Sequence, residues 1–250
     1  LGFYSTIPTR NHNLIPALPI SRTFFYNSTR MREIPLFPLN TVLFPGMPLH
    51  LHIFEERYKT MITHCIAQDG LLGIVLIHQG QESLGPLPKP YPVGTLGRIV
   101  EREVLPDGRM NITVLGIERF RIHSIHSGLL PYLTGSVETS PIELPNMLQV
   151  HRHSRELALS VRRYLTGLNQ AHIETMDFSQ FSLPDDPINL VFMAASLLQL
   201  PPEEKQPILE TGKLCDMMST VERLYRRENE LLPRLYTTEE TSASRVAWLN

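Results

Sequence analysis

The stretch IPLFPLNTVLFPGMPLHLHIFEERY, residues 34–58, indicates the architecture of the first half of the chain. Its apolar first part is interrupted by prolines, which cannot donate a hydrogen bond within a sheet, so we expect these segments at sheet edges or bends. Further on, Leu49, Leu51 and Ile53 alternate with histidines, the period-two pattern of a half-buried strand. From residue 55 the apolar side chains take helical spacing, which predicts a single helix among strands.

The sequence around this stretch, residues 33–138, keeps the patterns of β structure. Residues 71–77 are continuously apolar, which is typical of a strand buried on both faces. Four further strands are expected at residues 96–105, 110–115, 118–125 and 132–137. Pro106-Asp107-Gly108 separates the first two of these four, and this turn sequence predicts a β-hairpin because proline presets φ and glycine accepts a positive φ.

After Pro145 the apolar period changes from two to 3.6, and one apolar stripe follows residues 150–168. Asp186-Pro187 is typical of a helix start, with aspartate as the N-cap and proline at the first helical position. The next helix is apolar nearly all round, which predicts a place at the centre of a bundle. A last long helix is expected at about residues 212–232, and Pro207 predicts a kinked or shortened helix before it.

These patterns predict an α+β protein in which a β-rich N-terminal lobe precedes an α-helical bundle. We expect a disordered or targeting extension over residues 1–32, the β-rich lobe over 33–143, the helical lobe over 144–235 and a C-terminal tail over 236–250. The first thirty residues carry three arginines and no acidic residue, as organelle transit peptides do. We favour a cytoplasmic location, with Met31 as the true start. A plastid location is the alternative.

The composition favours a globular protein without nucleic-acid or membrane partners. Of the 250 residues, 42% are hydrophobic and 19% are charged, and the formal net charge is −2, so no overall field attracts the chain to polyanions. Residues 188–200 are the most apolar stretch, but crossing a bilayer takes about 20 residues. Cys65 and Cys215 lie in apolar surroundings without a Cys-x-x-Cys motif, which indicates reduced thiols.

Five short motifs in a fixed order point to a known family. They are residues 34–39, 42–46, 53–58, 94–97 and 116–120, which read IPLFPL, VLFPG, IFEERY, GTLG and GIERF. Together they resemble the N-terminal substrate-binding domain of Lon proteases, and specifically the short bacterial proteins that lack the ATPase and peptidase domains. The resemblance covers residues 33–233 and implies a pseudo-barrel N-terminal lobe, a helical C-terminal lobe and a part in recognising unfolded or tagged substrates.

Catalysis of the Lon type is not expected. An ATPase needs a Gly-x-x-x-x-Gly-Lys-Ser/Thr loop to hold phosphates. Gly212-Lys213 is followed by Leu214, and Pro207 stands where the first glycine would be needed. No lysine lies in a context that resembles a serine–lysine peptidase. We therefore expect no enzymatic activity, no catalytic residue and no cofactor.

Two pairs of histidines are candidate metal ligands. His50 and His52 share one face of a strand, but they would need further ligands from elsewhere. His151 and His153 lie two apart on a helix, where metal ligands need a spacing of three or four residues. We therefore expect no metal site, and we expect the strand pair to face solvent.

Two hypotheses on function remain. The first is a module that binds unfolded or exposed apolar polypeptide, and the second is a small-molecule sensor or unrecognised enzyme that uses a cleft between the lobes. The oligomeric state is left open. For the first hypothesis, candidate contacts lie near the proline-rich turns and in a long loop over residues 79–92. These candidates are Phe44, Met47, Leu84, Leu87, Pro88 and Tyr91. The opposing interpretation is that they pack internally, and for Phe44 we favour it.

Deleting residues 1–30 should leave the melting temperature unchanged. Their composition offers few paired apolar positions to offset the roughly 1–2 kcal/mol per residue that ordering a backbone costs. Circular dichroism melts of the full chain and of the truncated chain make the comparison. A drop of many degrees would mean that these residues pack on the core.

Overall fold

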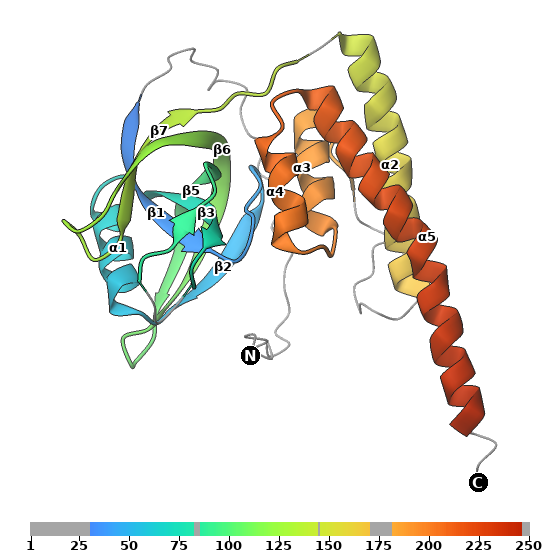
Figure 1. The fold of residues 1–250 in the computed structure, drawn as a ribbon, viewed down its shortest axis with the longest axis horizontal. Coiled ribbons are helices and arrows are strands. Elements are labelled where there is room, and N and C mark those ends of the chain that lie inside the picture. Colours follow the sequence, from blue (N-terminus) through green and yellow to red (C-terminus); the bar gives the residue numbers. More distant parts are fainter. Residues whose placement is uncertain (1–30, 83–85, 145, 171–181, 247–250) are drawn as a thin grey trace.

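The computed structural model describes residues 31–82, 86–144, 146–170 and 182–246, and for residues 169–170 and 233–246 it describes the backbone alone. A β lobe comes first along the chain, and a lobe of helices follows (Figure 1). This order confirms the predicted α+β class. Nearly all of the extension that we expect over residues 1–32 lies outside the described residues.

Five strands of the β lobe form a closed ring. They are β1 (Arg32–Leu39), β3 (Leu71–Gln79), β5 (Val93–Val104), β6 (Met110–His126) and β7 (Leu133–Thr139). Their order is β1-β7-β6-β5-β3, and a parallel pairing of β1 with β3 closes the ring. Two short strands lie outside it: β2 (Pro48–Ile53) pairs with β6, and β4 (Lys89–Pro90) pairs with β3. The predicted pseudo-barrel is therefore confirmed.

The proline-containing strand β1 is part of the ring and is not an edge strand over its whole length, but each of its prolines lies at a local edge, in agreement with the expectation of sheet edges or bends. Its first half pairs with β7 as far as Leu36, and from Leu36 onward it pairs with β3. Pro35 lies in the first half and Pro38 in the second, so each proline has a partner strand on one side alone. When the nitrogen of such a proline faces the side without a partner strand, its missing N–H removes no hydrogen bond from the sheet. The prediction holds for Pro48, which begins β2 beside β6.

Apolar side chains from all five ring strands fill the barrel. The cluster consists of Ile34, Leu36, Val75, Leu96, Phe120, Leu133 and Val137, all buried. Phe120 reaches across the interior because two facing positions carry no side chain: a Cβ on Gly73 would lie 2.7 Å from its ring, and one on Gly94 would lie 2.8 Å from it. The two glycines therefore leave the space that the ring of Phe120 fills.

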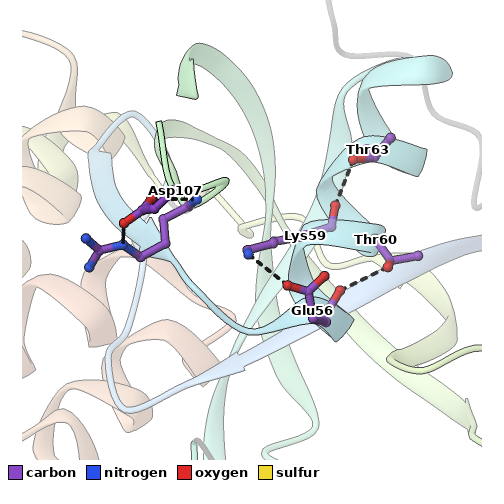
Figure 2. A network of polar contacts seen from close by, with 6 residues as sticks. Glu56, Lys59, Thr60, Thr63 and Asp107 are labelled. Atoms are coloured by element: carbon purple, nitrogen blue, oxygen red, sulfur yellow. Dashed lines mark hydrogen bonds and ion pairs between the residues drawn. The ribbon is translucent and has the colours of Figure 1, made fainter. Parts of the chain in front are cut away.

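The helix α1 (Glu56–Ala67) covers the side of the barrel that faces away from the helical lobe (Figure 1). Its buried side chains are Tyr58, Met61, Ile62 and Cys65, as the helical spacing predicts. Figure 2 shows its exposed side, where Lys59 Nζ donates to Glu56 at 2.8 Å beside the turn that holds Asp107. That turn joins β5 to β6 with Gly108 at φ 78°, which confirms the predicted hairpin. The strands predicted at 110–115 and 118–125 are one continuous strand, β6.

In the residues that the structure describes, the second lobe has four helices. They are α2 (Met147–Gln170), α3 (Pro187–Leu197), α4 (Pro202–Glu210) and α5 (Leu214–Val246). α2 and α5 lie side by side, with α3 and α4 between them and the barrel (Figure 1). α4, which contains Pro207, is short, as predicted. The predicted end of the last helix near residue 232 is wrong, because α5 continues to Val246.

Helix α3 is the centre of the bundle, as its apolar sequence predicts. Its N-cap is Asp186, whose Oδ1 accepts a hydrogen bond from the backbone N–H of Asn189 at 2.9 Å. Five of its eleven residues are buried: Leu190, Val191, Phe192, Ala194 and Ala195. The hydroxyl of Tyr225 on α5 donates to the carbonyl of Ala194 at 2.7 Å, which ties the two helices together without an unpaired polar group.

The two lobes are joined by Arg119 of β6, a side chain that is 3% exposed. Its Nη1 donates to the carbonyls of Leu209 and Thr211 at the end of α4. Its Nη2 donates to the carbonyls of Ser140 and Pro141, which follow β7, both at 3.1 Å. Burial lowers the pKa of this guanidinium to about 10, so it stays charged at neutral pH.

Two further contacts hold α4 and α3 against the barrel. The Nε2 of Gln206, which is buried on α4, donates to the carbonyl of Val93 in β5 at 2.9 Å. Phe44 is 1% exposed, and the centroid of its ring lies 6.0 Å from the ring centroid of Phe192 in α3. Because Phe44 and Val93 belong to the same buried cluster as the helices, the core of the bundle extends into the β lobe.

Replacing Asp186 with alanine should lower the free energy of unfolding by about 1 kcal/mol, because the N–H of Asn189 loses its acceptor. Asp185→Ala changes the neighbouring exposed carboxylate and serves as the matched control. Urea denaturation followed by circular dichroism measures both variants. Equal midpoints for the two variants would show that the cap contributes nothing.

Replacing Arg119 with methionine should lower the free energy of unfolding by about 3 kcal/mol or more, because four backbone carbonyls, one of them in a fully buried hydrogen bond and three in part-buried ones, lose a charged donor. Arg121→Met is the control, since that arginine lies two residues along the same strand and is exposed. The same urea denaturation compares the two. A midpoint for Arg119→Met that equals the control would contradict a joining role.

Candidate functional site

Two of the predicted contact residues are buried or half-buried between the lobes. The burial of Phe44 removes it from the surface that a partner could contact, which is the interpretation favoured for it from the sequence. Met47 is half-buried and packs against the clusters of both lobes. These apolar side chains and the hydrogen bonds of Arg119 fill the contact between the barrel and the helices. Nothing in this geometry therefore favours a small-molecule site there.

The predicted loop over residues 79–92 contains the short strand β4, and its described candidate residues are buried or half-buried. Leu87 is half-buried against the apolar filling of the barrel, and Pro88 is buried. Tyr91 is half-buried, and its ring lies 4.7 Å from that of His78 in β3. Leu84 lies outside the described residues. The described candidates of this loop therefore offer a partner only parts of their side chains.

Exposed apolar side chains lie instead just before α2 and along α2 as far as its middle. They are Leu144 (61% exposed), Met147 (73%), Leu148 (80%) and Leu159 (62%). Leu148 and Leu159 are eleven residues apart, which is three helical turns, so both lie on one face of α2. These positions lie off the buried stripe by which the sequence identifies this helix, and they are not among the predicted contact residues. The signal was present as leucines that stand among charged residues, off the stripe.

Cationic side chains line the same face. Leu148 and Leu159 border an open depression of about 500 Å³ together with His151, Arg152, Arg155 and Glu156. Arg152 and Arg155 are exposed, and Arg162 and Arg163 extend the positive charge one turn further. We call this set the α2 surface: the four apolar side chains with His151, Arg152 and Arg155.

One carboxylate lies among these cations. Arg152 Nε donates to Glu156 at 3.0 Å, and this hydrogen bond lowers the pKa of the Glu156 carboxyl. The pair neutralises one arginine, so Arg155, Arg162 and Arg163 leave a net positive field beside the leucines. The α2 surface therefore combines apolar contact area with positive charge.

Within the described ranges, no group of three or more His, Cys, Asp or Glu side chains is placed to hold a metal ion. His50 and His52 are exposed on β2, where the sequence predicts them. In the part of the chain that the structure describes, no helix is both long and apolar enough to cross a membrane.

Comparison with known proteins gives relatives of one kind. The chain is 25% identical over 206 residues to a Lon protease of Desulforamulus reducens, which covers 82% of this chain and 25% of that protein. It is 27% identical over 204 residues to Lon protease 2 of Myxococcus xanthus, covering 80% of this chain and 24% of the relative. The chain thus spans about a quarter of the length of the curated relatives that it matches.

Two solved structures share the fold. A Lon N-terminal domain protein from Xanthomonas campestris superposes with a TM-score of 0.53 and 23% identity, over 76% of this chain and 96% of that one. The N-terminal domain of a Mycobacterium avium complex Lon protease superposes with a TM-score of 0.58 and 18% identity, over 80% and 98%. The family model of the ATP-dependent protease La (LON) substrate-binding domain matches residues 33–226. This chain therefore belongs to the family of Lon substrate-binding domains.

Proposed function

We propose that this chain is a non-catalytic module that binds unfolded or exposed apolar polypeptide segments in protein quality control. The observation that carries the proposal is the α2 surface, where four large apolar side chains are each more than 60% exposed. Membership of the Lon substrate-binding domain family supports it. A non-catalytic role agrees with the match to a substrate-binding domain and with the missing phosphate-binding loop.

The apolar part of the α2 surface gives the binding energy in this proposal. Contiguous exposed apolar area that is bordered by polar residues marks interaction sites in soluble proteins. Leu148 and Leu159 border one depression, and Met147 lies directly before Leu148 in the chain. Because this depression is open, the expected binding is weak and tolerant of sequence.

The charge of the α2 surface selects among apolar segments. Arg155, Arg162 and Arg163 are exposed, and Glu156 is already hydrogen-bonded to Arg152. A polypeptide with acidic residues beside its apolar ones should therefore associate faster than a basic one. The same charge is too local for us to propose a nucleic acid or a membrane as the partner, since the whole chain carries a net charge of −2.

The loop over residues 79–92 stays in the proposal as a second contact region. Leu87 and Tyr91 are half-buried, so each has less area to offer than the leucines of α2. A cytoplasmic location is also part of the proposal, and it is supported by the two free thiols of Cys65 and Cys215.

Replacing Leu148 and Leu159 together with serine should weaken binding to a fluorescently labelled, permanently unfolded model protein by at least about tenfold. Burying two leucine side chains contributes more than the about 1.4 kcal/mol that corresponds to this factor. Fluorescence anisotropy measures the affinity. Both leucines are largely exposed, so the double variant should keep the melting temperature of the native chain.

Two matched variants make this measurement decisive. Leu129→Ser changes a leucine that is 95% exposed in the turn between β6 and β7, and it should bind as the native chain does. Serine at Leu84, Leu87 and Tyr91 tests the loop. Loss of binding in that variant, with the α2 variant unaffected, would move the site to the loop. No binding by the native chain would refute the proposed function.

A further inference from the structure

The outer face of the sheet formed by β2, β6 and β5 carries two parallel rows of hydrogen-bonded side chains. In the first row, His50 Nδ1 lies 3.0 Å from Thr113 Oγ1, and Thr113 Oγ1 lies 2.8 Å from a carboxylate oxygen of Glu101. The second row runs from His52 Nδ1 to Asn111 Oδ1 at 2.8 Å. Asn111 Nδ2 continues it to Glu103 at 2.9 Å. The strand register produces both rows, because each histidine and each glutamate faces the β6 residue between them.

The rows determine which nitrogen of each histidine carries the proton. The hydroxyl of Thr113 has a single hydrogen and donates it to Glu101, whose carboxylate only accepts. Thr113 must therefore accept from His50, so His50 carries its proton on Nδ1. In the second row Asn111 offers its amide oxygen to His52, which therefore also carries its proton on Nδ1. Both rings keep a lone pair on Nε2.

This arrangement is the one that metal-binding histidines adopt. A histidine that ligates a metal commonly donates its other ring N–H to an oxygen that is itself held in place, which fixes the tautomer and makes the free nitrogen a better ligand. His50 and His52 are both exposed and lie on the same strand face, about 6.6 Å apart along the chain. Because a metal–nitrogen bond is about 2.1 Å long, the two rings must turn toward each other until their Nε2 atoms lie within about 4 Å before they can share one cation.

We propose that His50 and His52 chelate a single divalent transition-metal ion of the kind that prefers imidazole, namely Zn²⁺, Ni²⁺ or Cu²⁺. Each histidine gives its Nε2, and water fills the remaining positions, since the described residues supply no third protein ligand. Glu101 and Glu103 at the far ends of the rows, and Asp107 at the turn, add negative charge around the ion. This site is separate from the α2 surface.

One cation on the same face opposes metal binding. Nη1 of Arg109 lies 3.4 Å from His52 Nε2, and the same guanidinium is bound to Asp107 through its Nε. A metal ion must displace Arg109 from His52. Removing this side chain should therefore tighten metal binding, whereas a purely structural role of the histidines would not respond in that way.

The matched control is a second His-x-His pair in the same chain. His151 and His153 have the same spacing in sequence, but they lie on α2, where residues two apart point in different directions. Isothermal titration of the untagged full chain with ZnCl₂ and with NiCl₂ should show one site. Replacing His50 and His52 with glutamine should weaken it at least about tenfold, and replacing His151 and His153 should leave it unchanged.

Variants of the rows test the proton assignment. Thr113→Val keeps the side-chain volume and removes the acceptor of His50, which should weaken metal binding by about tenfold while the fold is retained. Arg109→Ala should strengthen it. In the metal-free protein, two-bond ¹H–¹⁵N correlations of the rings should show the Nδ1–H tautomer for both histidines. Nε2–H tautomers, unchanged affinity in the His50 and His52 variant, or no metal binding by the native chain would each overturn the proposal.

Discussion

The guanidinium of Arg119 is the interaction on which the relative placement of the two lobes depends. It is buried in β6 and donates to four backbone carbonyls that belong to the end of α4 and to the connection after β7. The last carbonyls of a helix have no partner within the helix and carry partial negative charge. A planar side chain with several donors satisfies them together, which the single ammonium of a lysine does less well.

The consequences of this contact reach both candidate surfaces. With α4 held by Arg119 and Gln206, α3 packs on Phe44, and the bundle core is continuous with the β lobe. α2 then lies on the far side of α3 and α4 from the barrel, so one of its faces stays open to a partner (Figure 1). On the barrel, β2 adds to β6 outside the ring, and the register of that addition aligns His50 and His52 with their partner side chains.

Predicting the candidate site from the sequence was harder than predicting the fold. The loop over residues 79–92 has the composition of an exposed binding loop, yet Pro88 is buried and Leu87 packs against the barrel core. Local composition does not report what lies next to a loop after folding. Leu148 and Leu159 were not predicted as contacts for a different reason. An amphipathic helix is recognised by its buried stripe, and these two exposed leucines lie outside that stripe.

The features that depend on near neighbours in the chain could be predicted from the sequence alone. These are the change from period two to period 3.6, the hairpin turn at Asp107-Gly108, the cap at Asp186 and the ordered motifs of the family. Only the tertiary structure decided how β1 divides its pairing between β7 and β3, and which carbonyls Arg119 binds. The contacts of Arg119 join residues as far as 92 positions apart, and the energy of all these contacts comes from burial and register that no local pattern contains.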